Sequence, residues 1–519
     1  MEKKPLSPAD AGWAALVGLA ALALYVRTVV TIPLPGDSGE FQVLVHQLGA
    51  AHTTGYSTYL LLGHLFERLL PFGDVALRVN LFSAVMAALT VALVFLAGKL
   101  LTGSRAAAVV GALTLAAGFT FWSQAIIAEV YSTGAAFLSA VLVCVLLWYR
   151  TGKSWPIVLA GLLGGAGLGA HGSLGPLGLA VMLFLALNWA RRREWLAAGA
   201  VGAALGLALY LGGMFLVDAN QAPANVFNAA YTPARANWGL SAADVENPVA
   251  RVWFLVSAGQ WRSALFSSPL VDTPVGLFTY FSKLPRDVTL PALALALLGL
   301  AMLFRRDWRL ATFLLAGLGL QLAVYTNYNV GDRYVFFIPT YVLWSLLAAA
   351  GLAELLAAIG RRRWGNRLVQ AGITTATAAL LIAPLLAPQW AAVQTGTTPF
   401  LRIDEYLVKA DTVGISRIAA QTTAALEPDA LVFTEWHWLY PYYYAAHIEQ
   451  GKTATRFIET YPRADTRGLA ASVLAYVADN IDSRPIYLTS RDTAFTQTGY
   501  RLRPVQMGPQ LWYRVEQAP

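Results

Sequence analysis

The sequence predicts a polytopic α-helical membrane protein that ends in a small soluble α/β domain. Of its 519 residues, 57% are hydrophobic and only 13% are charged, whereas soluble domains usually carry about 25% charged residues. Long uncharged runs recur as far as residue 388, and the composition becomes that of a soluble domain from about residue 400. We therefore expect a multi-span transmembrane domain over 1–390 and an external α/β domain over 391–519.

The first apolar run, from Ala11 to Ile32, follows Lys3 and Lys4. It is long enough to cross a bilayer and too long for the apolar part of a cleaved signal peptide, so it predicts an uncleaved first helix. Together with ten later runs it gives about 11 transmembrane helices, near 12–32, 75–98, 105–122, 132–149, 155–170, 175–190, 195–217, 288–304, 309–327, 334–359 and 367–388.

The basic residues predict the orientation of these spans. Cytoplasmic loops are enriched in Lys and Arg, and five basic clusters fall in alternate loops together with Lys3 and Lys4, namely Lys99 with Arg105, Arg150 with Lys153, Arg191–Arg193, Arg305–Arg309 and Arg361–Arg367. The N-terminus is therefore predicted to be cytoplasmic and the C-terminal domain extracytoplasmic. This distribution of the net charge of +8 indicates membrane topology and no nucleic acid partner. A single cysteine, Cys144, excludes a disulfide within the chain and a thiolate metal site.

Two external loops are long enough to carry function. In the first, 33–74, two short apolar segments over 37–48 and 55–70 contain polar residues, which predicts two amphipathic helices lying at the outer membrane interface. The second, 218–287, is rich in aromatic residues that suit either an interfacial belt or a lid over a cavity.

The last 120 residues alternate between strand and helix patterns. Apolar runs bounded by turn residues predict buried strands over 429–435 and 484–490, a helix over 468–481 and a last strand over 511–516. Neither a Gly-x-Gly-x-x-Gly motif nor a P-loop is present, so no nucleotide site is indicated.

Asp37 and Glu40 are the candidate catalytic residues. They lie three residues apart, which places both on the same side of a helix. Asp37-Ser38-Gly39-Glu40 also has the spacing of a capping box, so a structural role is open and compatible with catalysis. Glycosyl transfer from a sugar phosphate releases an anion that needs no proton, which leaves one requirement, a base for the acceptor hydroxyl. We expect Asp37 to be this base and Glu40 to orient Asp37 or the acceptor.

Three arginines expected on the external side are candidates to bind a donor phosphate: Arg27, Arg78 and Arg333. Arg27 lies near the end of a span, where a side chain can also simply extend to the interface. Arg78 and Asn80 could instead brace each other or the first loop. Asn80, and Asp332 beside Arg333, are further candidates for substrate binding.

Histidines and a tyrosine complete the candidate site. His52 and Tyr56 are expected to line the donor pocket, and His52 with the two carboxylates could instead hold a divalent metal. His171 falls in an external turn, where it either lines the cavity or packs at the interface. No cofactor is certain from these patterns.

Several motifs resemble a known family. They are Gly36–Phe41, Leu48-Gly49, His52–Tyr56, Arg78–Ser83 and Tyr328–Tyr334 with Ile338-Pro339. Together they resemble the DUF2723 family of membrane proteins, which is related to protein O-mannosyltransferases and other C-type (GT-C) glycosyltransferases. The family often has His-Pro-Pro-Gly-Tyr-Pro where this chain has His52-Thr53-Thr54-Gly55-Tyr56-Ser57.

The resemblance implies a GT-C-like fold with Asp37 in the position of the catalytic carboxylate of the first external loop. It also implies a polyprenyl- or dolichyl-phosphate sugar donor and a hydroxyl acceptor on a protein, lipid or glycan. The expected function is thus an inverting membrane glycosyltransferase. A transporter or flippase is the main alternative, and a scaffold whose external domain binds a partner is a third. Charges gathered at span ends and on one external loop favour the enzyme, because transporters place ionisable residues within spans.

Overall fold

The computed structural model describes residues 6–189, 195–267, 269–362, 365–398, 402–403, 406–407, 412–462 and 469–518. The chain divides into two compact units. The first comprises Met1–Val30, Leu81–Leu211 and Ser263–Phe400, and the second comprises Thr31–Asn80, Gly212–Arg262 and Leu401–Pro519. Two long helices, α4 (Val75–Thr102) and α11 (Trp195–Ala219), begin in one unit and end in the other.

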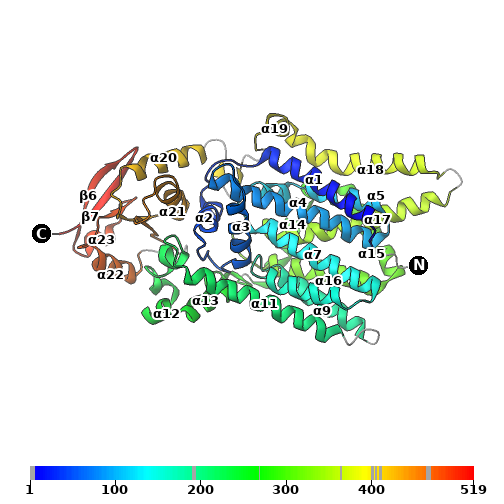
Figure 1. Ribbon diagram of the computed structural model, residues 1–519, viewed down its shortest axis with the longest axis horizontal. Helices are drawn as coiled ribbons and strands as arrows, with labels where there is room; N and C mark the ends of the chain where they lie inside the picture. The colour runs from blue at the N-terminus through cyan, green and yellow to red at the C-terminus, as the bar shows by residue number, and fades with distance from the viewer. Residues whose placement is uncertain are drawn as a thin grey trace. The chain divides into compact units, whose positions relative to one another are not determined.

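The first unit is helical (Figure 1). Besides most of α4 and α11, it contains α1 (Pro8–Thr28), α5 (Arg105–Ala117), α6 (Phe119–Ala125), α7 (Val130–Thr151), α8 (Trp155–Gly167), α9 (Leu174–Leu187), α14 (Thr273–Lys283), α15 (Leu290–Arg306), α16 (Trp308–Tyr325), α17 (Ile338–Gly360), α18 (Arg367–Leu386) and α19 (Trp390–Thr395).

The described helices confirm an integral membrane protein and support up to nine of the eleven predicted spans. Seven are long and apolar enough to cross a bilayer: α1, α4, α7, α11, α16, Val335–Gly360 and Arg367–Thr395. Two more are bent pairs, α5 with α6 at 69° and Leu270–Arg286 with α15 at 112°. The remaining predicted spans, 155–170 and 175–190, correspond to α8 and α9, with 13 and 14 residues. They are apolar but shorter than the ~20 residues that usually cross a bilayer, and the turn predicted around His171 lies between them.

In the second unit, two helices confirm the pair predicted in the first external loop: α2 (Gly36–Gln47) and α3 (Ser57–Leu69). α3 keeps an exposed apolar side with Leu62, Leu65 and Leu69, as an interfacial helix requires. For α2, however, the prediction of an amphipathic interface helix is wrong, because residues 38–45 are all buried. Its outer side is covered by α21 (Trp436–Tyr443) from the C-terminal region.

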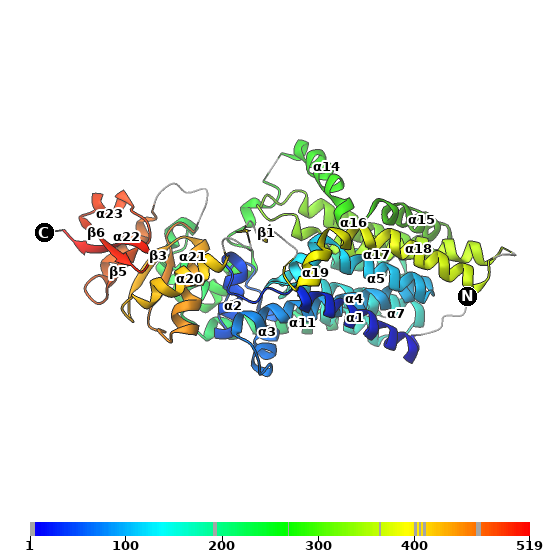
Figure 2. The same ribbon diagram turned by 90° about the horizontal axis from the view of Figure 1, so that it is seen from above.

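The C-terminal region contains a mixed five-stranded sheet, seen edge-on in Figure 2, with strand order β4-β3-β5-β7-β6. β3 is parallel to β4 and β5, whereas β7 is antiparallel to β5 and β6. The strands are β3 (Leu431–Thr434), β4 (Arg456–Glu459), β5 (Ile486–Leu488), β6 (Tyr500–Met507) and β7 (Gln510–Gln517), and the helices around them are α20 (Thr412–Ala424), α21, α22 (Ala471–Asn480) and α23 (Thr493–Gln497). The three predicted strands and the predicted helix are confirmed as β3, β5, β7 and α22, whereas β4 and β6 were not predicted.

The second unit is built from three distant segments of the chain. The hydroxyl of Tyr443 on α21 donates to the carbonyl of Pro223 at 3.1 Å and to that of Phe457 on β4 at 2.8 Å. The Ala76 backbone N–H donates to the Tyr444 hydroxyl at 3.1 Å. α12 (Ala242–Glu246) and α13 (Pro248–Val256) come from the predicted long external loop. The first external loop is therefore held within a unit that also contains the sheet.

Candidate active site

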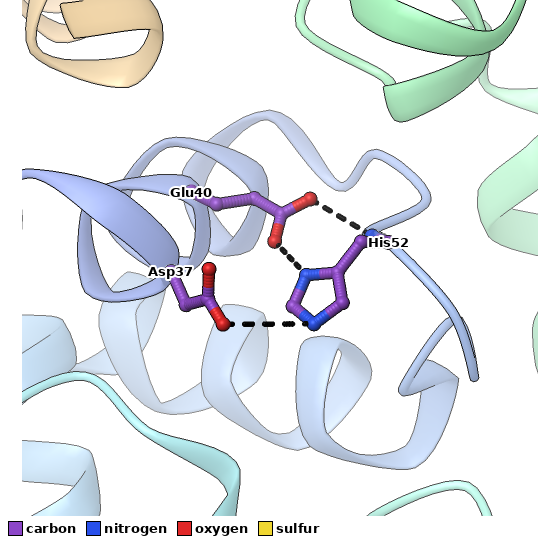
Figure 3. A group of neighbouring side chains, drawn as sticks. All are labelled: Asp37, Glu40 and His52. Atoms are coloured by element: carbon purple, nitrogen blue, oxygen red, sulfur yellow. Dashed lines mark hydrogen bonds and ion pairs between the residues drawn. The ribbon is translucent and has the colours of Figure 1, made fainter. Parts of the chain in front are cut away.

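The site begins at the N-terminus of α2. The residue before the helix is Pro35, and no side chain caps the first turn. The predicted capping box is therefore not formed, although Asp37 and Glu40 do lie on the same side of α2, as their spacing predicts (Figure 3). Asp37 lies in the first turn, where the helix dipole favours a carboxylate. Glu40 points to His52 in the loop between α2 and α3.

Glu40 and His52 form a buried pair. The Oε1 atom of Glu40 accepts the backbone N–H of His52 at 2.8 Å, and Oε2 accepts from Nδ1 of the imidazole in a very short contact. Tyr440 of α21 donates its hydroxyl to Oε1 at 3.2 Å. The Glu40 side chain is fully buried, and a buried carboxylate is tolerated only with such compensation. Glu40 was predicted to orient Asp37 or the acceptor. In the structure its carboxylate instead holds His52.

Asp37 is the reachable carboxylate of the cluster. Its Oδ2 faces Nε2 of His52 at 3.7 Å, and its Oδ1 accepts a hydrogen bond from the indole N–H of Trp436 at 3.1 Å. The Asp37 side chain is 40% exposed, in contrast to Glu40. A substrate hydroxyl can therefore approach Asp37, while Glu40 lies beneath His52.

Aromatic rings enclose the His52 imidazole. The ring centroids of Tyr56, Phe41 and Trp436 lie 5.3, 5.9 and 6.1 Å from it. The turn between His52 and Tyr56 needs a glycine at Gly55, which has a φ of +81° and whose added Cβ would lie 2.2 Å from Met214 Cε. The structure thus brings together Asp37, Glu40, His52 and Tyr56 from the predicted set.

A further carboxyl group, Glu459, ends β4 and is only 8% exposed. Burial, and then the negative charges of Glu40 and Asp37, raise its pKa to about 8, while His52 acts in the opposite direction. Glu459 is therefore a neutral acid at pH 7. Burial and then the charge of Glu40 also raise the pKa of Tyr440 well above its ordinary value, so its hydroxyl stays a donor.

The same cluster contains the ligand atoms for a divalent cation. Asp37, Glu40 and His52 each offer an atom within 4.8 Å of the others. Both oxygens of Glu40, however, already accept hydrogen bonds. A cation would therefore be held by Asp37 and Nε2 of His52, with Glu40 orienting the histidine as carboxylates commonly do at metal sites.

Two other predicted residues of the second unit are engaged away from Asp37. Arg78 binds Glu67 of α3 through Nε at 3.0 Å and Nη2 at 2.5 Å. Asn80 accepts a hydrogen bond from the side chain of Gln42 at 3.1 Å. Both residues thus brace the first loop, one of the roles expected for them, and phosphate binding by Arg78 stays a prediction.

Four predicted residues lie in the first unit. Arg27 donates to the carbonyls of Val393 and Gln394, at 3.0 and 2.6 Å. His171 is buried beside Tyr131, whose hydroxyl donates to Asp332 at 2.9 Å. These contacts give Arg27, His171 and Asp332 structural partners, and their substrate roles stay predictions.

Arg333 lines a cavity of about 140 Å³ in the first unit, together with Lys283 and Arg286. Arg333 donates to the Thr326 carbonyl at 3.1 Å. The Arg286 guanidinium lies over the ring of Phe119 at 4.7 Å. Three cations thus line one small cavity, and the predicted binding of a phosphate by Arg333 stays a prediction.

Sequence reasoning missed five of these residues. Lys283 and Arg286 were detectable as cations in a predicted external loop, the face that positive charges otherwise avoid. Trp436 and Tyr440 belong to an aromatic run that looked like packing, and Glu459 ends a strand that was not predicted.

Comparison with known proteins begins with the stretch that contains the site. Residues 37–219 match the family described as protein O-mannosyl-transferase TMEM260 N-terminal domain. The mouse protein O-mannosyl-transferase TMEM260 is 37% identical over 133 residues, and the Dictyostelium discoideum protein of that name is 26% identical over 136 residues. These alignments cover 25% and 26% of this chain but only 19% and 16% of the relatives. The assignment to DUF2723 itself stays a prediction.

The fold matches a solved structure over nearly its whole length. ArnT from Cupriavidus metallidurans in the apo state superposes with a TM-score of 0.57 at 14% identity, covering 98% of both chains. ArnT bound to undecaprenyl phosphate gives the same score at 13% identity, over 97% of this chain and 98% of ArnT. The chain therefore has the GT-C glycosyltransferase fold that was predicted.

Proposed function

We propose that this protein is an inverting membrane glycosyltransferase that transfers a sugar from a polyprenyl-phosphate donor to an acceptor hydroxyl on the extracytoplasmic side. The observation that carries the proposal is the half-exposed carboxylate of Asp37 beside the buried Glu40–His52 pair. Two kinds of relative support it. One is described as a protein O-mannosyl-transferase, and the other was solved with undecaprenyl phosphate bound. Mannose and a protein hydroxyl are therefore the first substrates to test.

In the proposed reaction, Asp37 takes the proton of the acceptor hydroxyl as its oxygen attacks the anomeric carbon. The bond between that carbon and the phosphate oxygen breaks, and polyprenyl phosphate leaves as an anion that needs no proton. Attack opposite the leaving group inverts the configuration. Glu40 orients the imidazole of His52, and Nε2 of that ring lies 3.7 Å from Oδ2 of Asp37.

We further propose that the cavity of Lys283, Arg286 and Arg333 binds the donor phosphate. Guanidinium and ammonium groups form strong charge-assisted hydrogen bonds with phosphate oxygens. The aromatic side chains of Tyr280, Tyr334 and Tyr341 also line this cavity.

The transporter alternative is less well supported. Transporters place ionisable groups within spans near the midplane. Here the cluster lies on α2 and its following loop, and α2 is not among the candidate spans of the described residues.

The deciding experiment compares Asp37→Asn with wild type in membranes supplied with tritiated polyprenyl-phosphate mannose. We expect label transfer to the protein fraction to be lost in Asp37→Asn and retained in Asp429→Asn, an exposed position of the same unit. Wild-type transfer by Asp37→Asn would refute the role of Asp37 as base.

A further inference from the structure

The helix α21 brings two side chains from the C-terminal region to the catalytic loop. It follows directly after strand β3 and packs against α2. Trp436 and Tyr440 lie four residues apart, so both face the same neighbour. The close approach depends on Gly39, where an added Cβ would lie 3.3 Å from Cβ of Tyr440. Trp436 and Tyr440 lie outside the 37–219 stretch that matches the family model.

Each of the two side chains donates one hydrogen bond to the site. The indole N–H of Trp436 binds Oδ1 of Asp37 at 3.1 Å, and the hydroxyl of Tyr440 binds Oε1 of Glu40 at 3.2 Å. An indole can only donate, and the Tyr440 hydroxyl stays protonated at every physiological pH. Both are therefore permanent donors to carboxylates, a class of hydrogen bond stronger than neutral pairs.

We propose that Trp436 and Tyr440 are positioning residues, through which the C-terminal region sets the geometry of the reaction. This inference rests on the proposed role of Asp37 as base. Trp436 binds one oxygen of Asp37 and so leaves Oδ2, beside His52, as the oxygen that takes the proton. Tyr440 binds the oxygen of Glu40 that also accepts the His52 backbone N–H, and so fixes the loop that presents the imidazole.

A purely structural role for α21 makes different predictions. If Trp436 only fills space, then a phenyl ring of similar shape preserves the reaction. If it positions Asp37, losing the N–H leaves both carboxylate oxygens free to rotate. The turnover number then falls, while donor binding is unchanged.

The test uses the full-length protein in membranes with tritiated polyprenyl-phosphate mannose. Trp436→Phe and Tyr440→Phe are compared with Trp438→Phe and Tyr442→Phe, the same changes at two stacked residues of the same helix. We expect the first pair to lower kcat about ten- to hundredfold with donor KM unchanged. Both controls should stay within about twofold of wild type. Trp436→His, which keeps a ring N–H, should recover part of kcat.

A wild-type kcat in Trp436→Phe would overturn the inference, as would an equal loss in Trp438→Phe. Thermal unfolding midpoints of all variants separate lost positioning from lost folding, because a positioning role predicts a lower kcat per folded molecule. The Asp37→Asn variant distinguishes this failure from failure of the proposed function. If Asp37→Asn is inactive while Trp436→Phe behaves as wild type, only the positioning role is refuted.

Discussion

The carboxylate of Glu40 holds His52 at two points, the backbone N–H and Nδ1 of the ring. Both the position of the loop and the orientation of the imidazole are thus set by one buried side chain. Because Nδ1 is occupied by Glu40, Nε2 is the ring atom that faces Asp37. The cluster is therefore ordered from a buried carboxylate, through a histidine, to the carboxylate that a substrate can reach.

Removing the charge of Glu40 should disable this arrangement without affecting donor binding. In Glu40→Gln the amide keeps one acceptor but loses the charge that holds the imidazole, so we expect kcat to fall about ten- to hundredfold at unchanged donor KM. Label transfer from tritiated polyprenyl-phosphate mannose at varied donor concentration measures both. Glu246→Gln, an exposed position of the same unit, is the matched control. Wild-type kcat in Glu40→Gln would show that His52 needs no such orientation.

Glu459 should make the stability of the protein depend on pH. The pKa of its carboxyl is raised from 4.5 to about 8 in the folded state by burial and by the nearby carboxylates. Between these values the folded state binds more protons than the unfolded state, so the free energy of unfolding falls as pH rises. Its contribution is fully present below about pH 4.5 and is lost by about pH 8, at up to about 1.4 kcal/mol per pH unit.

The variant Glu459→Gln removes this titration. Its thermal unfolding midpoint, measured in detergent, should rise relative to wild type as pH increases from 5 to 8, because the wild type alone loses stability through Glu459. Glu435→Gln, an exposed position just after β3, should follow the wild-type curve. Parallel curves for Glu459→Gln and wild type would contradict the raised pKa.

The sequence predicted the features whose signal is local. The apolar runs predicted the helices, and the strands β3, β5 and β7 were recognisable from short apolar segments between turn residues. Asp37, Glu40 and His52 could be grouped from the sequence because all three lie within a segment of 16 residues. Fold class also followed from these local patterns and from the resemblance that the motifs carry.

What could not be predicted depends on contacts between distant segments. The burial of α2 requires α21, which follows it by almost 400 residues, so the segment alone looked like an interfacial helix. Trp436 and Tyr440 gain their partners only in the folded unit, and their aromatic run predicts packing equally well. The exact helix ends could not be predicted either, since a run of apolar residues does not reveal where a helix stops.

Gly39 should be the residue on α2 that tolerates a side chain least. An added Cβ would lie 2.2 Å from the Leu34 carbonyl oxygen and 3.3 Å from Tyr440 Cβ. Gly39→Ala should therefore displace the backbone at Leu34, tighten the contact with Tyr440 of α21 and destabilise the unit by about 1–3 kcal/mol. Gly414→Ala on α20, where nothing lies within 4 Å, should stabilise the protein or leave it unchanged. Equal unfolding midpoints for the two variants would show that this close packing does not matter.

Measurements of kinetics and stability can distinguish between the arginines that are candidates to bind the donor phosphate. Arg333 lines the cavity with Lys283 and Arg286, so Arg333→Gln should raise donor KM about tenfold with little change in kcat, as for a contact made equally in the ground and transition states. Arg78 instead pairs with Glu67, whose side chain is only 1% exposed. Arg78→Gln leaves that carboxylate with only its more distant partners His46 and Arg68, each at 3.4 Å, and should cost about 1–3 kcal/mol of stability, visible as a lower thermal unfolding midpoint, at unchanged donor KM of the folded protein. The reverse pattern, with donor KM raised by Arg78→Gln and not by Arg333→Gln, would place the phosphate at the first loop and refute binding in the three-cation cavity.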